Sequence, residues 1–545
     1  MDALTVVPLP VNEPVRGYAP SSPERASLKR VLDEMAATPI ELKAWIGGER
    51  RDGTGEARHE VRMPSDHSVL LGSVQQASAQ DATAAIEAAL AAKHDWAALD
   101  FDARAAIFLR AAELLAGPWR DRANAATMLG QAKTVQQAEI DSACELIDFL
   151  RFNVAYAREL HANQPLNSPL VWNRMDYRPL DGFVYAITPF NFTAIAGNLP
   201  TAPALLGNTV LWKPALTQQR AADVIVSVLE EAGLPPGVIN LLPGHGAEVS
   251  EVALRHPDLA GIHFTGSTRV FQGLWAEIGA NIARYRSYPR IVGETGGKDF
   301  LVAHPSADGP TLVTALLRGA FEYSGQKCSA TSRAYLPRSL WNSLKDDLIG
   351  QTEAMSVGDV RDFSNFTSAV IDERAFTKLS DAIERARASA ECEIVAGGRY
   401  DREQGWYIRP TLVTSTNPAN EIFSTEYFGP LLGLYIYEDA DYADVLGLVD
   451  AGSPYALTGS VMATDRAAIE LASRRLRQAA GNFYINDKST GAVVGQQPFG
   501  GGRASGTNDK AGSLWNLMRW VSPRVIKENL LPPVALDYPH MAPEA

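Results

Sequence analysis

The stretch GFVYAIT, residues 182–188, decides the fold class of this chain. It is a short run of apolar, β-branched and aromatic side chains that begins at a glycine, which is typical of a strand buried inside a sheet. Similar runs follow at residues 209–213, 238–242 and 261–264. A helical pattern that ends at Gly233 lies between the runs at 209–213 and 238–242. Strands that alternate with helices form a parallel sheet with right-handed crossovers. The sequence therefore predicts an α/β fold.

Helical patterns dominate the chain before this stretch, and a second α/β block follows it. Apolar residues recur at helical spacing over residues 81–117, and a second helical stretch covers residues 123–161. The later block begins with a strand at 300–303, continues with a helix at 310–322 and returns to a strand at 333–336. The chain therefore contains two separate α/β patterns, which predict two cores.

Length and composition limit the class of protein. The chain has 545 residues, more than one hydrophobic core accommodates, so two or three domains are expected. The net charge of -13 and a pI near 5.3 argue against nucleic acid or an anionic membrane as a partner held by bulk electrostatics. No run of about 18 apolar residues occurs, so no transmembrane helix is expected. Residues 1–20 lack the pattern of a signal peptide and are expected to lie over the surface of the folded body.

Cysteine and histidine usage limits the cofactors. The three cysteines, Cys144, Cys328 and Cys392, are odd in number and widely spaced. This pattern predicts no disulfide framework and favours a reducing compartment, for which the cytoplasm is the prediction. The nine histidines show no metal-ligand spacing, so no metal site is expected.

Cys328 is the strongest candidate for a catalytic residue. It stands in GQKCSA, residues 325–330, where small and polar neighbours replace the apolar surroundings of a structural cysteine. Lys327 precedes it, and a nearby cation would lower the thiol pKa and favour the thiolate. The alternative is a small hydrophobic core residue, and the composition of this segment favours a nucleophile over it.

Glu294 and Asn191 could complete the chemistry of a nucleophilic thiol. Glu294 stands in VGETGGK, residues 292–298, where glycines allow a partner to approach the backbone closely. Its carboxylate could activate water, or it could be an ordinary surface residue. Asn191 follows the strand at 182–188 and could donate its amide to an oxyanion, or could simply form a turn.

Several strand ends could bind a dinucleotide. Lys213 ends the strand at 209–213, where a doubly wound sheet can bring a charge to a ribose. Gly266-Ser267 precedes a helical run, whose first amides can bind phosphate. In EYFGP, residues 426–430, Glu426 could meet ribose hydroxyls and an aromatic ring could lie beside a nicotinamide. Taken alone, each segment is also compatible with a solvated lysine or an ordinary turn.

In their order along the chain, these segments resemble the aldehyde dehydrogenase superfamily. The matching segments are Asn191, Lys213-Pro214, and residues 264–267, 294–298, 325–328 and 426–430. Longer stretches resemble the branch of that superfamily that oxidises L-glutamate γ-semialdehyde: PFNFTAIAGNLP at 189–200, FEYSGQKCSA at 321–330, GNFYINDKSTG at 481–491 and GQQPFGG at 495–501. The similarity runs from about residue 11 to residue 527.

The resemblance implies an NAD-dependent enzyme of proline catabolism and glutamate biosynthesis that forms L-glutamate through a cysteine thiohemiacetal and a thioester. Cys328 would be the nucleophile, Asn191 and the Cys328 N–H would hold the oxyanion, and Glu294 would activate the deacylating water. The implied cofactor-binding residues are Lys213, Pro214, Gly266, Ser267, Glu426 and Phe428. The implied substrate-binding residues are Phe192, Ser329, Gly491, Ala492 and Phe499.

The resemblance also implies a Rossmann-type cofactor domain, an α/β catalytic domain and a small oligomerisation element. The expected boundaries are an N-terminal arm at 1–40, a dinucleotide-binding domain at 41–162 and 181–293, a catalytic domain at 294–480, a substrate-anchoring loop region at 481–509, and oligomerisation elements at 163–180 and 510–545. The expected partners are a small-molecule substrate and further copies of the chain, in at least a dimer.

Three positions depart from the family pattern. Leu216 stands where many relatives carry a carboxylate for the adenosine ribose, which leaves NADP open beside NAD. Thr425 stands where Glu is common, and Ala492 stands where some relatives carry Ser, so that only a backbone contact survives there. An enzyme for another ω-semialdehyde and a non-catalytic protein with this fold remain alternatives. A CoA-acylating enzyme is disfavoured because Glu294 supplies a base for water.

Overall fold

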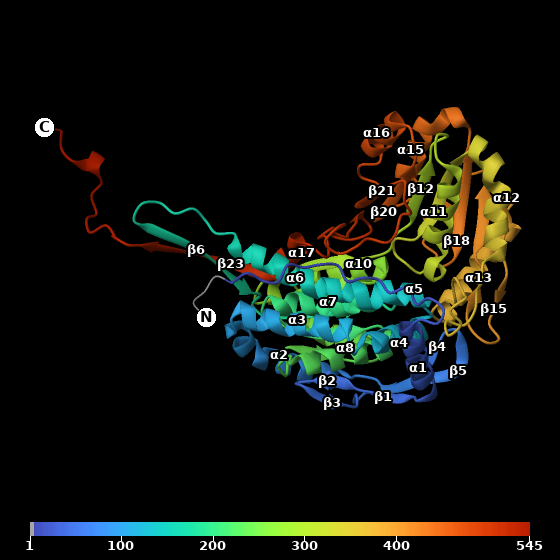
Figure 1. The fold of residues 1–545 in the computed structure, drawn as a ribbon. Helices are drawn as coiled ribbons and strands as arrows, with labels where there is room; N and C mark the ends of the chain where they lie inside the picture. The colour runs from blue at the N-terminus through green and yellow to red at the C-terminus, as the bar shows by residue number, and fades with distance from the viewer. Residues whose placement is uncertain (1–4, 545) are drawn as a thin grey trace.

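The structure is a computed structural model that describes residues 5–544. Two α/β bodies lie against each other, and a long β-arm projects from the first body and carries the C-terminal segment away from it (Figure 1). Every helix within residues 5–544 is too short or too polar to span a bilayer.

The first body is built on a seven-stranded sheet with the order β11-β10-β7-β8-β9-β2-β3. Its strands are β2 (Ala44–Ile46), β3 (Glu49–Arg51), β7 (Phe183–Thr188), β8 (Thr209–Pro214), β9 (Ile239–Leu241), β10 (Leu259–Thr265) and β11 (Arg290–Glu294). The strands from β11 to β9 pair in parallel, whereas β2 pairs antiparallel with β9 and β3. The four runs predicted as strands are therefore neighbours in one parallel sheet.

Helices cover both faces of this sheet. Alternate side chains of β7 point to opposite faces, so Val184 and Ala186 enter one core while Phe183 and Tyr185 enter the other. One layer contains α3 (Phe101–Ala116), α4 (Arg120–Gln131), α6 (Glu145–Ala162), α7 (Thr193–Leu205) and α8 (Gln219–Ala232). The other contains α2 (Ala79–Ala98), α9 (Ala247–Arg255) and α10 (Thr268–Ala280).

The two long helical stretches predicted before β7 are interrupted. Residues 81–117 form two helices, because Leu99 and Asp100 adopt extended backbone between α2 and α3. The stretch 123–161 is divided into α4, α5 (Val135–Ala138), the π-helix η1 (Glu139–Cys144) and α6. The left-handed Ala132, at φ 57°, ends α4. Apolar spacing continues on both sides of these breaks, so periodicity alone could not locate them.

The second body contains a seven-stranded sheet with the order β14-β17-β18-β13-β12-β20-β21. Its strands are β12 (Asp299–Ala303), β13 (Thr331–Pro337), β14 (Cys392–Ala396), β17 (Thr411–Ser415), β18 (Leu431–Tyr437), β20 (Thr458–Met462) and β21 (Asn482–Ile485). Only β14 is antiparallel to its neighbour among these described strands. The covering helices are α11 (Gly309–Phe321), α12 (Arg338–Ala354), α13 (Glu373–Ala388), α14 (Glu421–Ser424), α15 (Tyr442–Ala451) and α16 (Arg466–Arg475). The strands predicted at 300–303 and 333–336 are β12 and β13.

The arm consists of β6 (Val171–Pro179) and β23 (Val521–Asn529). They pair antiparallel over their whole length, from Val521↔Pro179 to Asn529↔Val171. The two segments predicted as oligomerisation elements thus meet in one two-stranded ribbon, which extends beyond the first body (Figure 1).

Smaller elements complete the molecule. A three-stranded sheet, β1-β5-β4, consists of β1 (Ile40–Leu42), β4 (Arg58–Met63) and β5 (Asp66–Gln75). Short pairs are formed by β15 (Tyr400–Asp401) with β16 (Tyr407–Ile408), and by β19 (Tyr455–Ala456) with β22 (Gly502–Arg503). The remaining helices are α1 (Pro23–Ala37) and α17 (Leu514–Met518). Residues 5–22 run over the layer that contains α3, α4 and α6. Thr5 donates a hydrogen bond to Asp102 on α3, and Asn12 donates one to Asp148 on α6.

Candidate active site

Cys328 follows a strained turn between α11 and β13. In the 3₁₀ helix η4 (Glu322–Gly325), Tyr323 and Ser324 both have left-handed backbone, at φ 52° and 50°. Buried hydrogen bonds hold the turn, because Thr367 Oγ1 accepts from the Ser324 N–H at 2.8 Å. Left-handed backbone at two successive non-glycine residues is costly, and such strain clusters at functional sites. The turn delivers Cys328 to a cavity between the two bodies.

That cavity gathers the predicted nucleophile and every predicted substrate contact. Its lining includes Cys328, Phe192, Ser329, Gly491, Ala492 and Phe499. Phe192 comes from the turn after β7, and Phe499 ends the loop of residues 489–499, named here the anchor loop. The Ser329 hydroxyl is 2.7 Å from Thr490 Oγ1, which fixes the start of the anchor loop beside the thiol. Side chains far apart in the sequence therefore surround one sulfur atom, and their roles stay predictions.

Asn191 is tied to the segment that carries the thiol. Its buried side-chain amide donates a hydrogen bond of 3.0 Å to the carbonyl of Gln326, two residues before Cys328. Gln326 is itself fixed, because its Oε1 accepts from the Ile371 N–H at 2.8 Å. The turn after β7 and the Cys328 segment are thus held together, as an oxyanion site shared by Asn191 and the Cys328 N–H requires.

The thiol pKa differs from the sequence-based expectation. Burial, together with the carboxylates of Asp299 and Glu294, raises the pKa of Cys328 well above its usual value. The expected lowering by Lys327 is wrong, because the Lys327 ammonium is turned to Asp141 at 3.5 Å and to Glu322 at 3.6 Å. The raised pKa disfavours the thiolate, so the thiol must lose its proton against this shift before it can attack.

Glu294 is the last residue of β11 and is half-buried, with little to stabilise its charge. Burial raises its pKa well above the usual value, against the lowering effects of the Gly501 N–H and of Lys510. Its Oε2 has no hydrogen-bond partner among the described residues. Gly500 leaves room for the carboxyl, since a Cβ there would lie 2.9 Å from Glu294 Oε1. A carboxyl whose pKa is raised in this way is suited to proton transfer.

Lys213 and Ser267 lie at the carboxyl ends of β8 and β10, the strands on either side of β7, and doubly wound folds bind nucleotides at such strand ends. The Lys213 ammonium is buried, which lowers its pKa to about 7, and it donates to the Pro214 carbonyl at 2.7 Å. The Ser267 hydroxyl caps α10 by accepting from the Val270 N–H, and Gly266 precedes it. A buried ammonium with a single backbone partner and a helix N-terminus suit the hydroxyls and phosphates of a dinucleotide.

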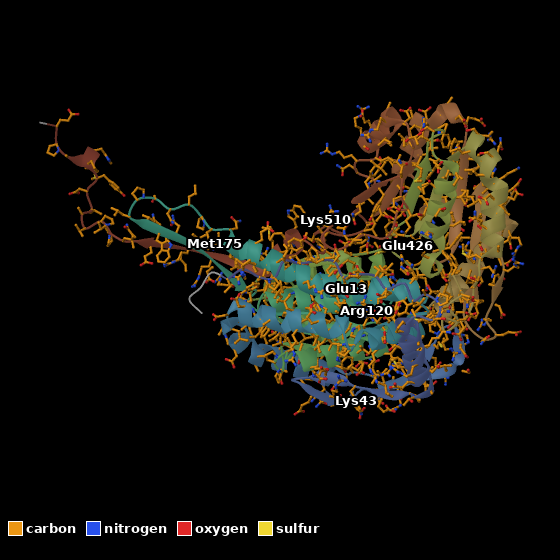
Figure 2. The ribbon with its side chains drawn as sticks, viewed as in Figure 1. Glu13, Lys43, Arg120, Met175, Glu426 and Lys510 are labelled. Carbon is orange, nitrogen blue, oxygen red and sulfur yellow. The ribbon has the colours of Figure 1, made fainter. Side chains whose placement is uncertain are left out.

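Glu426 joins the second body to the glycine turn after Glu294 (Figure 2). Its Oε1 accepts from the Gly297 N–H at 2.8 Å, and a Cβ at Gly296 would lie 2.3 Å from Oε2. Phe428 has left-handed backbone, at φ 58°, and its ring packs edge-on against Phe190. The structure thus brings the carboxylate and the aromatic ring of this segment to the junction of the two bodies.

Sequence reasoning missed a buried charged cluster in the same cavity. Asp141 and Glu145 line it from η1 and α6, and the ammonium of Lys133 lies 2.6 Å from Asp141. Burial and the Asp141 charge raise the pKa of Glu145 to about 8, and Glu145 Oε2 has no hydrogen-bond partner among residues 5–544. The signal was present in the sequence, because Glu139, Asp141, Glu145 and Asp148 interrupt an otherwise apolar helical stretch. Glu145 is thus a carboxyl free to meet a ligand beside Cys328.

Cys144, Cys328 and Cys392 are all free thiols. No cluster of three or more metal-ligating side chains occurs in the described part of the chain.

Comparisons with known proteins agree with this arrangement. The model of the aldehyde dehydrogenase family matches residues 51–526. The chain is 50% identical over 538 residues to the mitochondrial delta-1-pyrroline-5-carboxylate dehydrogenase of Dictyostelium discoideum, covering 98% of this chain and 96% of that protein. Its fold matches the crystal structure of the delta-pyrroline-5-carboxylate dehydrogenase from Mycobacterium tuberculosis with a TM-score of 0.97 and 59% identity, covering 100% of both chains.

A second structure of the Mycobacterium tuberculosis enzyme, bound with NAD, matches with a TM-score of 0.97 and 59% identity. It covers 99% of this chain and 100% of that chain. The family match spans most of the sequence, and these relatives align along nearly the whole chain. The chain therefore belongs to the aldehyde dehydrogenase family.

Proposed function

We propose that this protein oxidises L-glutamate γ-semialdehyde, the open form of Δ1-pyrroline-5-carboxylate, to L-glutamate with NAD. The observation that carries the proposal is the single cavity that is lined both by Cys328 and by Ser329, Gly491 and Ala492. A substrate with an aldehyde at one end and a carboxylate at the other needs both a nucleophile and a group of hydrogen-bond donors for the carboxylate. The names of the relatives at 50% and 59% identity support the same substrate. The reaction belongs to proline catabolism and yields glutamate.

Carbon–sulfur bond formation begins the reaction. The Cys328 thiolate attacks the aldehyde carbon, and the oxygen becomes an oxyanion that Asn191 and the Cys328 N–H stabilise. One such donor contributes about 3 kcal/mol to the transition state. NAD, when bound, accepts the hydride that leaves this carbon. The enzyme is left with a glutamyl thioester on Cys328.

Glu294 then releases the product. Its carboxylate takes a proton from water, the hydroxide attacks the thioester, and the thiolate of Cys328 leaves. Oε2 has no hydrogen-bond partner within residues 5–544, which supports this role, because an unpaired carboxylate oxygen can accept a proton from water. L-Glutamate and the free enzyme are the products.

The far end of the cavity would hold the amino-acid part of the substrate. The left-handed backbone of Gly491, at φ 102°, shapes the turn whose N–H groups, at Gly491 and Ala492, would bind the carboxylate with the Ser329 hydroxyl. Phe192 and Phe499 would enclose the aliphatic chain. Glu145 would accept the substrate ammonium, and that positive charge would keep Glu145 ionised.

The residues at the strand ends fit NAD. Lys213 and Glu426 would bind ribose hydroxyls, Gly266 and Ser267 would bind the diphosphate at the start of α10, and Pro214 and Phe428 would pack against the rings. NADP is the alternative cofactor, since Leu216 places no carboxylate where it would repel a 2′-phosphate. Initial rates with each cofactor would rank them.

The β6–β23 arm supports a homo-oligomer of at least two copies. Trp172 and Val525 on the arm are 49% and 61% exposed, and no further strand of the described part of the chain pairs with either edge of the ribbon. An open, apolar strand edge is suited to pairing with a second chain. β21 is an edge strand of the second sheet and provides a matching partner surface.

The free thiols support a reducing compartment. The cytoplasm is the proposed location, and the mitochondrial names of several relatives make the mitochondrial matrix the alternative. Fractionation of the source cells would decide between them.

Reduction of NAD on addition of Δ1-pyrroline-5-carboxylate tests the proposed activity. We expect turnover with this substrate, a much lower kcat/KM with succinate semialdehyde, which lacks the amino group, and no turnover by Cys328→Ser. Equal kcat/KM for the two semialdehydes would refute the assignment of substrate. Normal turnover by Cys328→Ser would refute the covalent route.

A further inference from the structure

Asn12 bridges the N-terminal segment and the anchor loop. Its Nδ2 donates to the Val494 carbonyl at 2.8 Å, and its Oδ1 accepts from Gln496 Nε2 at 3.0 Å. The same Nδ2 also donates to Asp148 Oδ2 on α6 at 2.8 Å. One amide side chain therefore connects α6 to the anchor loop and uses both its donor and its acceptor.

The middle of the anchor loop depends on this contact. The start of the loop is fixed by the Ser489 hydroxyl, which donates to the Ser329 carbonyl at 2.9 Å, and its end by the backbone pair of Phe499 and Ala511. Between these ends, the only side chain outside the loop that hydrogen bonds to residues 491–497, among residues 5–544, is that of Asn12. Gly491 and Gly495 both adopt positive φ, and glycine backbone is costly to order.

Asn12 is itself held rigidly. The N–H of the next residue, Glu13, donates to Asp148 Oδ1 at 2.7 Å, and its carboxylate pairs with Arg120 and Arg151. Figure 2 shows Glu13 and Arg120 close together over the helical layer. Asn12 is bonded to Asp148 on α6, and its neighbour Glu13 is paired with Arg120 on α4. The Asn12 amide therefore fixes the loop relative to these two helices.

We infer that Asn12 is a positioning residue for the substrate carboxylate. It holds Val494 and Gln496, which lie two to five residues after the Gly491 and Ala492 amides that bind the carboxylate under the proposed function, on which this inference rests. Fixing the loop aims those amides at the substrate before it binds, and such preorganisation lowers the cost of binding. Asn12 touches neither the thiol nor the cofactor site, so its effect is confined to binding of the carboxylate end.

The test compares two aldehydes in matched variants. In Asn12→Ala and in Gln496→Ala, we expect KM for the semialdehyde to rise about three- to tenfold, as loss of one or two hydrogen bonds implies, with kcat little changed. Propanal, which has no carboxylate, should keep its KM. The double variant should be no worse than Asn12→Ala, because that single change already removes the contact with Gln496. Thr5→Ala is the control, since its hydroxyl bonds to Asp102 on α3 and to Arg158 on α6 and, among the described residues, makes no hydrogen bond to the loop.

Amide hydrogen exchange of the loop gives a readout that does not depend on turnover. Residues 491–497 should exchange faster in Asn12→Ala than in the wild type, and at the wild-type rate in Thr5→Ala. Unchanged exchange in Asn12→Ala, an unchanged KM for the semialdehyde, or an equal rise in KM for propanal would overturn the inference. A wild-type enzyme that oxidised propanal but not the semialdehyde would refute the proposed function instead, and the exchange rates would still decide whether Asn12 orders the loop.

Discussion

Cys328 and Glu294 both have a pKa raised well above the ordinary value of the group. Burial is the first cause of the raised pKa of each group. The charge of Glu294 raises the pKa of the Cys328 thiol further, and the charge of Asp509 raises the pKa of Glu294 further. A neutral thiol is a poor nucleophile towards solvent oxidants, so the pocket protects the sulfur until a substrate arrives. Reactivity therefore depends on proton loss at both residues.

The rate of each chemical step should rise with pH. Because the thiol pKa lies above its ordinary value, the burst of reduced cofactor should accelerate into the alkaline range. Because the pKa of Glu294 lies above the value usual for a glutamate, the deacylation rate should also increase with pH at values where an ordinary glutamate is already fully ionised. Stopped-flow absorbance across a pH series measures both steps. Rates that stayed constant from weakly acidic to alkaline buffer would contradict the raised pKa values.

Replacing Glu294 should separate the two halves of the reaction. In Glu294→Gln the first turnover should remain, because the thiol and the oxyanion site are intact, while steady-state turnover should fall about a hundredfold or more through loss of the base. A burst of reduced cofactor followed by a slow phase is the expected trace. Steady-state turnover at the wild-type rate would exclude Glu294 as the base, and Asp509→Asn, which changes a nearby carboxylate, serves as the control.

The sequence predicts which residues form the site, but it does not predict the direction of their pKa shifts. Segments at 189–200, 321–330 and 481–491 pointed to Phe192, Ser329 and Gly491, and the cavity gathers all three. The direction of the Cys328 pKa shift was wrong, because the orientation of Lys327 depends on Asp141 and Glu322 from other parts of the chain. Asn12 could not be found from the sequence, since its partner Val494 is 482 residues away.

At the level of secondary-structure elements, strands were predictable and helix ends were not. The run at 182–188 coincides with β7, because a strand buried on both faces must be apolar throughout. The break between α2 and α3 and the π-helix η1 could not be predicted, because tertiary contacts select them. In η1, the buried Glu139 accepts hydrogen bonds from Tyr18 and Asn124.

The anchor loop provides a test at this level. Gly491→Ala should strain the backbone, because Gly491 has φ 102° and an added Cβ would lie 3.3 Å from the Lys488 ammonium. We expect KM for the semialdehyde to rise about tenfold, from a conformational cost of about 1–2 kcal/mol, while KM for propanal stays unchanged. Gly273→Ala in α10 is the matched control, since a Cβ there meets no atom within 4 Å. Equal changes with both aldehydes would show that the loop does not bind the carboxylate.

At the scale of the whole molecule, the β-arm stands apart from both bodies (Figure 1). A two-stranded ribbon is marginally stable alone, so its ordered projection is best explained by a partner that covers it. Trp172 and Val525 are exposed apolar side chains among the charged residues of the arm, on a chain whose net charge of -13 otherwise opposes self-association.

A charge placed on the arm should separate the copies. Val525→Glu puts a carboxylate on an exposed apolar position of β23, and burying that charge in an interface is costly. Sedimentation velocity should show a smaller species than the wild type. Leu448→Glu on α15, also an exposed apolar position, is the control and should leave the mass unchanged. A wild-type sedimentation coefficient for Val525→Glu would show that the arm is not the interface.

The acyl-enzyme on Cys328 is the intermediate on which the proposed mechanism depends. Glu294→Gln mixed with NAD and Δ1-pyrroline-5-carboxylate, quenched in acid during the burst and digested, allows the Cys328 peptide to be weighed. The predicted result is a glutamyl addition on Cys328 in step with the reduced cofactor formed, and no addition in the Cys328→Ser, Glu294→Gln double variant. Reduced cofactor formed in the burst while the Cys328 peptide stays unmodified would contradict the mechanism.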